Sequence, residues 1–300
     1  MVVRLPHHPA LQSVEALEAA LNAHGYVPDP ALSMALYLAL RMEKPLLLEG
    51  EAGVGKTEVA KVLAAILDAE LIRLQCYEGI DLASAGYEWN YLRQILALRV
   101  AEASGAARLD DVFQREFLIE RPLLRAITAG DGRPAVLLID EIDRADDEFE
   151  AFLLEVLSDF QISIPELGTV RAERVPVVIL TSNRTREIHD ALKRRCLYAW
   201  IDYPTFEKEL RIVQTKVPAA SEKLAREVCQ FLQLLRRQDI YKLPGISETL
   251  DWTHALVVLG QHELDEATVT RTIGCLVKYQ EDLRSLRPET LAGLVRQARE

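Results

Sequence analysis

The chain has 300 residues, of which 49% are hydrophobic and 27% are charged, and its formal net charge is −11. These values are typical of a soluble globular protein with two domains, and the acidic balance disfavours nonspecific binding to nucleic acid. No apolar run approaches the roughly 18 residues of a membrane span, and proline and histidine interrupt the N-terminal segment where a secretion signal needs its apolar core. We therefore expect a cytoplasmic protein without a membrane span.

Two helices are expected before the first strand. Apolar residues recur at helical spacing over 14–21, and a second helical segment covers 30–42. The apolar run 45–48 predicts the first strand, and further strands are predicted at 71–76, 135–140, 175–181 and 197–201, with helical stretches between them. Apolar strands that alternate with helices indicate an α/β fold, in which helices cover both faces of a parallel five-stranded sheet.

The segment that follows the first strand, residues 50–57, reads GEAGVGKT and fits the pattern G-x-x-x-x-G-K-[ST]. Its glycines allow successive N–H groups to turn inward around phosphate oxygens at the start of the next helix. Lys56 would reach the β- and γ-phosphates of a nucleoside triphosphate, and the Thr57 hydroxyl would ligate Mg²⁺. The predicted nucleotide-binding residues are Gly50, Glu51, Ala52, Gly53, Val54, Gly55, Lys56, Thr57 and Glu58.

Two later strands end in polar side chains. Asp140 ends the strand at 135–140 and Glu141 follows it, while Asn183 follows another apolar strand. Two acids at a strand end often form only a solvated turn, but the carboxyl ends of parallel strands meet at one edge of the sheet, which is where such sheets bind ligands. We expect Asp140 to support Mg²⁺ through water, Glu141 to polarise the attacking water, and Asn183 to orient that water or touch the γ-phosphate.

Three cations, Lys193, Arg194 and Arg195, lie at the end of a short predicted helix. Cations are favourable at a helix C-terminus without any further role. The alternative is an arginine finger, which would stabilise charge on the phosphoryl group of a nucleotide that a neighbouring subunit binds. This alternative predicts a ring or another head-to-tail oligomer.

Strand signals end at about residue 204, and helices are predicted at 206–217, 219–238, 246–260 and 288–299. We therefore expect a nucleotide-binding α/β domain over 1–204 and an all-α lid domain over 205–300. The stretch between Lys56 and Asp140 is longer than one strand and two helices need, which predicts an insertion at about 77–121. Alternating residues around a turn predict a hairpin at about 161–175.

Taken together, GEAGVGKT, LLIDEID, VVILTSN, ALKRRC and the helical region after them resemble the AAA+ ATPases over nearly the whole chain. The insertion, the hairpin and the stretch DEIDRAD are similar to the MoxR group. The stretches LIRLQCYEGID, YEWNYLRQIL and GISETLDW resemble the CoxD branch of that group, which is linked to maturation of aerobic carbon monoxide dehydrogenase.

The resemblance implies ATP and Mg²⁺ as cofactors and assigns a role to each motif residue. Lys56 and Thr57 would bind phosphate and Mg²⁺, Asp140 would support the metal, and Glu141 would be the catalytic base. Asn183 would sense the γ-phosphate, and Arg195 would be the finger, with Arg194 as the alternative. Many relatives place an arginine at the start of a lid helix, but here the matching stretch, 247–249, contains no arginine. Arg236 or Arg237 in the preceding helix could take the place of this lid arginine.

The resemblance further implies a hexameric ring that remodels a client metalloenzyme, such as a molybdenum hydroxylase, with a von Willebrand factor A domain protein as partner. The missing lid arginine leaves a second hypothesis open, a slow nucleotide-dependent switch or adaptor. A nucleic-acid motor is a third, which the lack of a basic strip with interleaved aromatics disfavours. The aromatics Tyr87, Trp89 and Tyr91 of the insertion would either grip a client or serve as packing residues.

Overall fold

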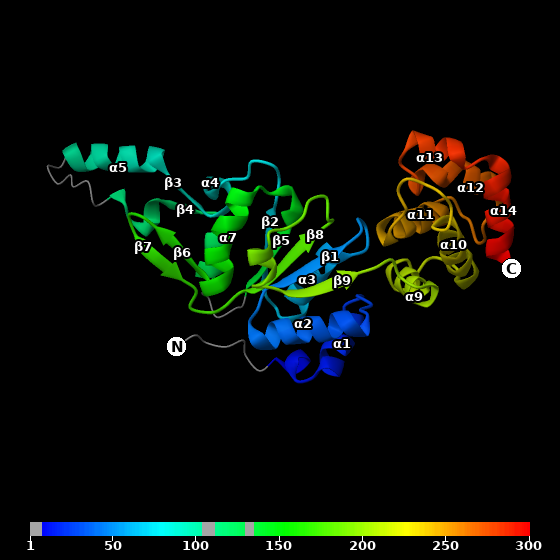
Figure 1. Cartoon of the computed structure of the whole chain (residues 1–300), viewed down its shortest axis with the longest axis horizontal. Helices are drawn as coiled ribbons and strands as arrows, with labels where there is room; N and C mark the ends of the chain where they lie inside the picture. Colours follow the sequence, from blue (N-terminus) through cyan, green and yellow to red (C-terminus); the bar gives the residue numbers. More distant parts are fainter. Residues whose placement is uncertain (1–7, 104–111, 130–134) are drawn as a thin grey trace. The chain divides into compact units, whose positions relative to one another are not determined.

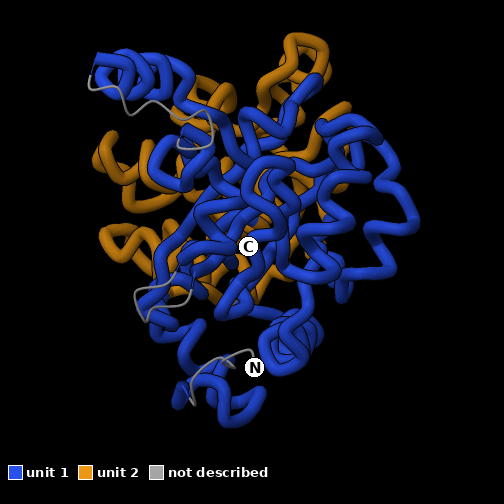
Figure 2. The backbone as a smooth tube through the Cα atoms, turned by 90° about the vertical axis from the view of Figure 1, so that its left-hand side faces the viewer, with its two compact units in different colours: residues 1–24, 28–49, 57–200 blue, residues 25–27, 50–56, 201–300 orange. Residues whose placement is uncertain are grey.

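A computed structural model describes residues 8–103, 112–129 and 135–300 (Figure 1). Two compact units divide the chain: one holds residues 1–24, 28–49 and 57–200, and the other holds 25–27, 50–56 and 201–300 (Figure 2). The second unit thus groups the GEAGVGKT loop, up to Lys56, with the C-terminal helices. The domain boundary at residues 204 and 205 stays a prediction.

The first unit is built on a five-stranded sheet with the order β2-β5-β8-β1-β9. The strands are β1 (Leu46–Gly50), β2 (Glu70–Gln75), β5 (Ala135–Asp140), β8 (Val177–Ser182) and β9 (Leu197–Ile201). Every residue of β5 and β8 is buried, because helices cover both faces of the sheet. The predicted α/β fold with a parallel sheet is confirmed, and β2 and β8 begin within two residues of their predicted positions.

The register of the strands brings their polar ends to one edge of the sheet. Gln75 at the end of β2 lies opposite Asp140 at the end of β5, and Leu48 of β1 lies opposite Thr181 of β8. Parallel strands run in the same direction, so residues that lie far apart in the sequence meet where the strands end.

The helices of the first unit pack against this sheet or extend from it. Buried Leu153 and Val156 belong to the same apolar cluster as the strand residues Leu137 and Leu180, which fixes helix α7 on the sheet. The other helices are α1 (Val14–Ala23), α2 (Pro30–Met42), α3 (Lys56–Ile66), α4 (Leu82–Ala85), α5 (Tyr91–Ala103), α6 (Pro122–Thr128) and α8 (Asp190–Lys193), and α7 covers Asp147–Asp159. Short 3-10 turns lie at Pro9–Leu11, Arg115–Phe117 and Ile142–Arg144.

Two small sheets lie outside the main one. Strand β3 (Tyr87–Trp89) pairs antiparallel with β4 (Leu118–Glu120), a pairing that the sequence pattern does not predict. Strand β6 (Gln161–Ile164) pairs antiparallel with β7 (Gly168–Arg171), so a hairpin lies where the alternating pattern occurs. Residues 104–111 of the expected insertion lie outside the described part of the chain.

The aromatics of the insertion have different environments. Trp89 is buried, its ring meets Phe113 edge-on with centroids 5.5 Å apart, and its Nε1 donates a hydrogen bond to Glu166. Tyr91 at the start of α5 is exposed, as are Leu92 and other apolar residues of that helix. Trp89 is therefore a packing residue, whereas Tyr91 is available for contact with another molecule.

In the second unit, residues 201–300 form a helical core. Trp252 and Phe231 are fully buried with ring centroids 5.2 Å apart, and the Trp252 Nε1 donates to the Thr272 hydroxyl. The helices are α9 (Phe206–Lys216), α10 (Glu222–Leu235), α11 (Ile246–Val258), α12 (Glu266–Thr272), α13 (Gln280–Ser285) and α14 (Pro288–Arg299), with a 3-10 turn at Ile273–Cys275. This helical C-terminal region is as predicted, except that α12 and α13 were not. Throughout the part of the chain that is described, no helix has both the length and the apolar character to cross a bilayer.

Candidate nucleotide-binding site

The loop between β1 and α3 has the backbone that its glycines predict. Gly53 and Gly55 adopt φ of +78° and +97°, in the left-handed region that favours glycine. A Cβ on Gly50 would lie 2.1 Å from the carbonyl oxygen of Ile201, so no larger residue fits there. The loop ends at the N-terminus of α3, and the first-turn N–H groups and dipole of a helix favour an anion at such a position.

Lys56 is folded over this loop. Its Nζ donates hydrogen bonds of 2.7 Å to the carbonyl oxygen of Gly50 and 2.6 Å to that of Glu51, and the residue is only 6% exposed. The loop therefore already holds the ammonium group within its own curve. Glu51 in the loop is exposed, and Glu58 in the first turn of α3 is half-buried.

The start of helix α11 packs directly on the same loop. The carbonyl oxygen of Gly53 accepts hydrogen bonds from the Ser247 backbone N at 3.1 Å and from its hydroxyl at 3.3 Å. A Cβ on Gly245 would lie 2.8 Å from the carbonyl oxygen of Ala52, which shows how closely the two backbones approach. The Glu248 carboxylate accepts a hydrogen bond from the Gly245 N, as in a capping box.

Arg236, a suggested substitute for the missing lid arginine, forms an ion pair with Glu209. Its Nη1 and Nη2 donate hydrogen bonds of 2.7 Å to the two carboxylate oxygens of Glu209, and both side chains are almost fully buried. The Arg236 Nε also donates to the carbonyl oxygen of Pro244, next to the start of α11. A bidentate pair of this kind fixes the guanidinium, so Arg236 has a structural role. Arg237 is exposed.

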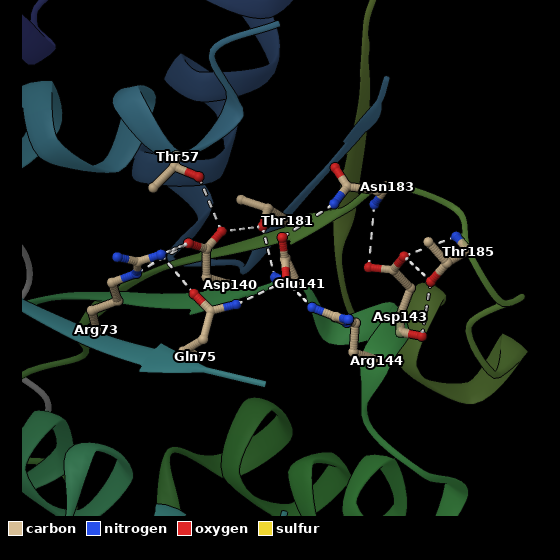
Figure 3. A network of polar contacts seen from close by, with 10 residues as sticks. All are labelled: Thr57, Arg73, Gln75, Asp140, Glu141, Asp143, Arg144, Thr181, Asn183 and Thr185. Carbon is tan, nitrogen blue, oxygen red and sulfur yellow. Dashed lines mark hydrogen bonds and ion pairs between the residues drawn. The ribbon is translucent and has the colours of Figure 1, made fainter. Parts of the chain in front are cut away.

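In the first unit, Asp140 is the centre of a polar network at the end of β5 (Figure 3). Its Oδ1 accepts hydrogen bonds from the Thr57 hydroxyl at 3.0 Å and from the Thr181 hydroxyl at 2.5 Å. Its Oδ2 accepts from the Nε and Nη2 of Arg73 at 3.0 and 2.6 Å. Thr57 and Asp140 thus place two hard oxygens side by side, the ligand type of Mg²⁺, an ion that takes one or two protein ligands together with phosphate and water.

Glu141 lies beside Asp140 with its carboxylate held by three side chains (Figure 3). Oε1 accepts a hydrogen bond from the Asn183 amide at 3.4 Å, and Oε2 accepts from the Gln75 amide at 3.0 Å and from Arg144 at 3.3 Å. The Glu141 backbone is left-handed, with φ of +56°. The carboxylate is about one-third exposed, so an oriented base remains open to water.

The loop after β8 is positioned by Asp143, a buried residue of the same acidic segment. Its Oδ1 accepts from the Asn183 backbone N at 3.2 Å, and its Oδ2 accepts from the N and the hydroxyl of Thr185 at 2.8 and 2.6 Å. The structure therefore places Asn183 next to Glu141 through contacts of both its backbone and its side chain.

The two candidate finger residues at the end of α8 differ in their contacts. The Arg195 side chain donates to the Ser158 hydroxyl and to the Ala191 carbonyl oxygen, which ties it to α7 and to its own helix. Arg194 is exposed. Arg144 is also exposed apart from its contact with Glu141.

Sequence reasoning missed five residues of the network: Arg73, Gln75, Asp143, Thr181 and Thr185. The signal for the first two was local, since they alternate with the apolar residues Ile72 and Leu74 along the strand. Asp143 and Thr181 carried no such signal, because an acid after a strand and a threonine within one are common.

Cys76 follows β2 and donates its backbone N–H to the Asp140 carbonyl oxygen. Burial raises the pKa of its thiol from 9.0 to about 12, and the neighbouring Asp140 carboxylate acts in the same direction. Burial likewise raises the pKa of the Cys196 thiol to about 12, against the opposing effect of Arg195. Both thiols are therefore neutral at physiological pH.

Comparison with known proteins identifies relatives by sequence and neighbours by structure. Uncharacterized proteins of Staphylococcus aureus, among them those of strains USA300 and COL, are 26% identical over 226 residues, which are 73% of this chain and 77% of theirs. A mutant of Thermotoga maritima RuvB aligns with 93% of this chain and 72% of its own at 16% identity, with a TM-score of 0.49. The T. maritima RuvB Holliday junction branch migration motor aligns with 87% of this chain and 71% of its own at 17% identity, with a TM-score of 0.45.

The family assignment rests on a direct match and not on the RuvB likeness. Residues 45–196, just over half of the chain, match the profile of the AAA domain of the dynein-related subfamily. This range contains the phosphate loop, the acids Asp140 and Glu141 at the end of β5, Asn183 and the arginine pair. The chain therefore belongs to the dynein-related subfamily of AAA domains, a family of P-loop ATPases.

Proposed function

We propose that the chain is a Mg²⁺-dependent ATPase that hydrolyses ATP to ADP and phosphate. The observation that supports this most directly is the network in which Thr57, Asp140, Glu141 and Asn183 converge at one edge of the sheet. Lys56 and Thr57 are adjacent in the chain, so the phosphate loop is covalently joined to this network.

Each residue of the network has a role that its contacts suit. The N–H groups of the loop and Lys56 would bind the phosphates, with the ammonium moving from the loop carbonyls to phosphate oxygens. Thr57 and Asp140 would hold Mg²⁺, which supplies charge neutralisation at the phosphates when it is bound. Glu141 would accept a proton from the attacking water, and Asn183 would keep the Glu141 carboxylate and that water in line.

The exchange Glu141→Gln tests this proposal. It should reduce phosphate release by at least about 100-fold, the usual size of a general-base effect, and leave the affinity for a fluorescent ATP analogue unchanged. Glu148→Gln, which alters an exposed acid at the start of α7, is the matched control and should behave like the wild type. Full turnover by Glu141→Gln would disprove the assigned chemistry.

We also propose that the site is completed by an arginine of a neighbouring subunit in a ring, six subunits being the number expected. Arg195 is the residue that the motif favours, while the exposure of Arg194 supports the alternative. If the arginine acts between subunits, mixing an inactive arginine variant with inactive Glu141→Gln should restore part of the turnover. Testing Arg194→Ala and Arg195→Ala separately identifies the finger, and light scattering measures the subunit number.

The proposed product of the cycle is remodelling of a client metalloenzyme, such as a molybdenum hydroxylase, together with a von Willebrand factor A domain partner. Support for this finer proposal comes from the MoxR-like and CoxD-like stretches of the sequence. Affinity purification of Glu141→Gln from native extract with ATP is the test. Recovery of either class of protein would support the proposal, and recovery of this chain alone would count against it.

A slow nucleotide-dependent switch or adaptor is the second candidate, and the commitment of Arg236 to Glu209 favours it. Without a lid arginine at the phosphates, transition-state charge loses one stabilising group. A switch would hydrolyse slowly both alone and with its partner, whereas a remodelling ATPase would be accelerated by partner and client. Turnover measured in both states separates the two.

A further inference from the structure

The acceptor capacity of the Asp140 carboxylate is fully used in this structure. A carboxylate has about four lone-pair sites, two on each oxygen. Here two hydroxyl groups bind Oδ1, and the Nε and Nη2 of Arg73 bind Oδ2 (Figure 3). A metal ion, or water bound to it, can therefore reach this carboxylate only if one of the present donors leaves.

The three donors differ in their freedom to leave. Thr181 belongs to the buried strand β8 and also accepts the Glu141 N–H, so its position is fixed from two sides. Thr57 begins α3 beside the phosphate loop and is itself a metal ligand in the proposed function. Arg73 lies on the edge strand β2 with 53% of its side chain exposed, and its other partner is the exposed Gln75 amide oxygen of the same strand, at 2.6 Å. Its guanidinium can therefore leave Oδ2 and be solvated by water.

The charges at the site also identify Arg73 as the donor that leaves. The Asp140 side chain is only 4% exposed, and a buried carboxylate needs a cation. Arg73 meets this need through two charge-assisted hydrogen bonds to one oxygen. A divalent cation at Thr57 and Asp140 would meet the need in its place, and it would repel the guanidinium across the same carboxylate.

We propose that Arg73 is the resident counter-ion of Asp140 and is exchanged for the divalent cation. In the metal-free chain Arg73 neutralises and orients the carboxylate; when metal binds, the guanidinium withdraws from Oδ2. Arg73 is thus a positioning residue that stabilises the metal-free state and raises the metal concentration at which the site fills. This inference rests on the proposed role of Thr57 and Asp140 in holding Mg²⁺.

The test measures metal binding without nucleotide and without turnover. Mn²⁺ alone is the probe, followed by the loss of its free electron paramagnetic resonance signal, and melting temperatures are recorded in EDTA and in rising Mg²⁺. Arg73→Ala should bind Mn²⁺ about tenfold more tightly, the factor that one charge-assisted hydrogen bond commonly contributes. In EDTA it should melt on the order of 4 °C lower, and saturating Mg²⁺ should remove most of that difference.

Two further variants keep the result interpretable. Arg125→Ala is the matched control, because Arg125 pairs with Glu70 at the other end of β2 and that carboxylate is exposed; metal binding should not change. Arg73→Lys keeps the charge without the two-donor geometry, so its Mn²⁺ affinity should lie between wild type and Arg73→Ala. The lysine variant also serves if the alanine variant does not fold.

The proposed replacement of Arg73 by the cation is refuted if Arg73→Ala binds Mn²⁺ with unchanged or weaker affinity, or if neither the wild type nor Arg73→Ala binds Mn²⁺. It is also overturned if the loss in melting temperature persists at saturating Mg²⁺, which would make the pair purely structural. Failure of the proposed ATPase function gives a different result from failure of the Arg73 proposal. A wild-type protein that shows the expected Mn²⁺ behaviour without hydrolysing ATP would retain the exchange and remove the ATPase assignment.

Discussion

Replacing Arg236 with methionine should destabilise the helical core of residues 201–300 by about 3–5 kcal/mol, because it leaves a buried carboxylate without its cation. Glu209 is fully buried and accepts hydrogen bonds from four donor groups. Arg236 supplies two of these, while Gln233 and Thr249 supply the others. Two lost hydrogen bonds to a charged group, each contributing about 1.5–3 kcal/mol, give about 3–6 kcal/mol, which overlaps this range.

Urea denaturation followed by circular dichroism and by tryptophan fluorescence measures this loss. Trp252 is a suitable reporter, since it is fully buried in the same core. Arg237→Ala is the neighbouring control, and this exposed residue should change the free energy of unfolding by no more than about 0.5 kcal/mol. Combining Arg236→Met with Glu209→Leu should recover much of the loss, because neither charge is then left unpaired.

One outcome would refute the reasoning. If Arg236→Met unfolded at the wild-type urea concentration while ATP turnover fell, Arg236 would act on the nucleotide and not on the packing of its helices. The buried pair with Glu209 would then not describe the state that hydrolyses ATP.

Three further outcomes are expected. Gly245→Ala pushes a methyl group against the phosphate-loop backbone and should weaken ATP-analogue binding about tenfold, as measured by fluorescence titration. Gly293→Ala is the control, because its methyl group meets open space and should leave the affinity unchanged; equal effects of the two variants would contradict the contact. Asp143→Ala leaves the backbone N–H of Asn183 unpaired and should lower phosphate release more than tenfold with nucleotide affinity retained; unchanged turnover would refute its positioning role. Cys76, whose thiol pKa is raised to about 12, should resist alkylation by iodoacetamide at pH 8 until urea unfolds the chain. The neutral thiol contributes to the free energy of unfolding below its ordinary pKa of 9.0, and this contribution is lost as the pH rises toward 12.

The parts of the fold that the sequence predicts are those with local signals. The buried strands β5 and β8 are continuous apolar runs, and the phosphate loop needs glycine at fixed positions, so both are visible without tertiary information. Strands β3 and β4 have three residues each, too few to show a period, and they pair across a long separation in the chain. Their existence depends on tertiary contacts.

The residues of the candidate site also fall into those with a local sequence signal and those that only the folded sheet brings together. Asp140, Glu141 and Asn183 stand at the ends of strands, which is where a sequence pattern can place them. The partners Arg73 and Gln75 depend on strand register, because only the pairing of β2 with β5 sets Gln75 opposite Asp140. A neighbour relation of this kind is a property of the folded sheet, and no single stretch of sequence carries it.

The close approach of Gly245 to the phosphate loop has a mechanical consequence. A long arginine side chain between a lid helix and a phosphate has several rotatable bonds, which absorb part of any displacement. Here the backbone of Gly245 meets the backbone of Ala52 and Gly53 with no side chain between them, and Ser247 hydrogen-bonds the Gly53 carbonyl oxygen. Because the two backbones are in direct contact, a shift of the loop by a few tenths of an ångström displaces the first turn of α11 by nearly the same distance.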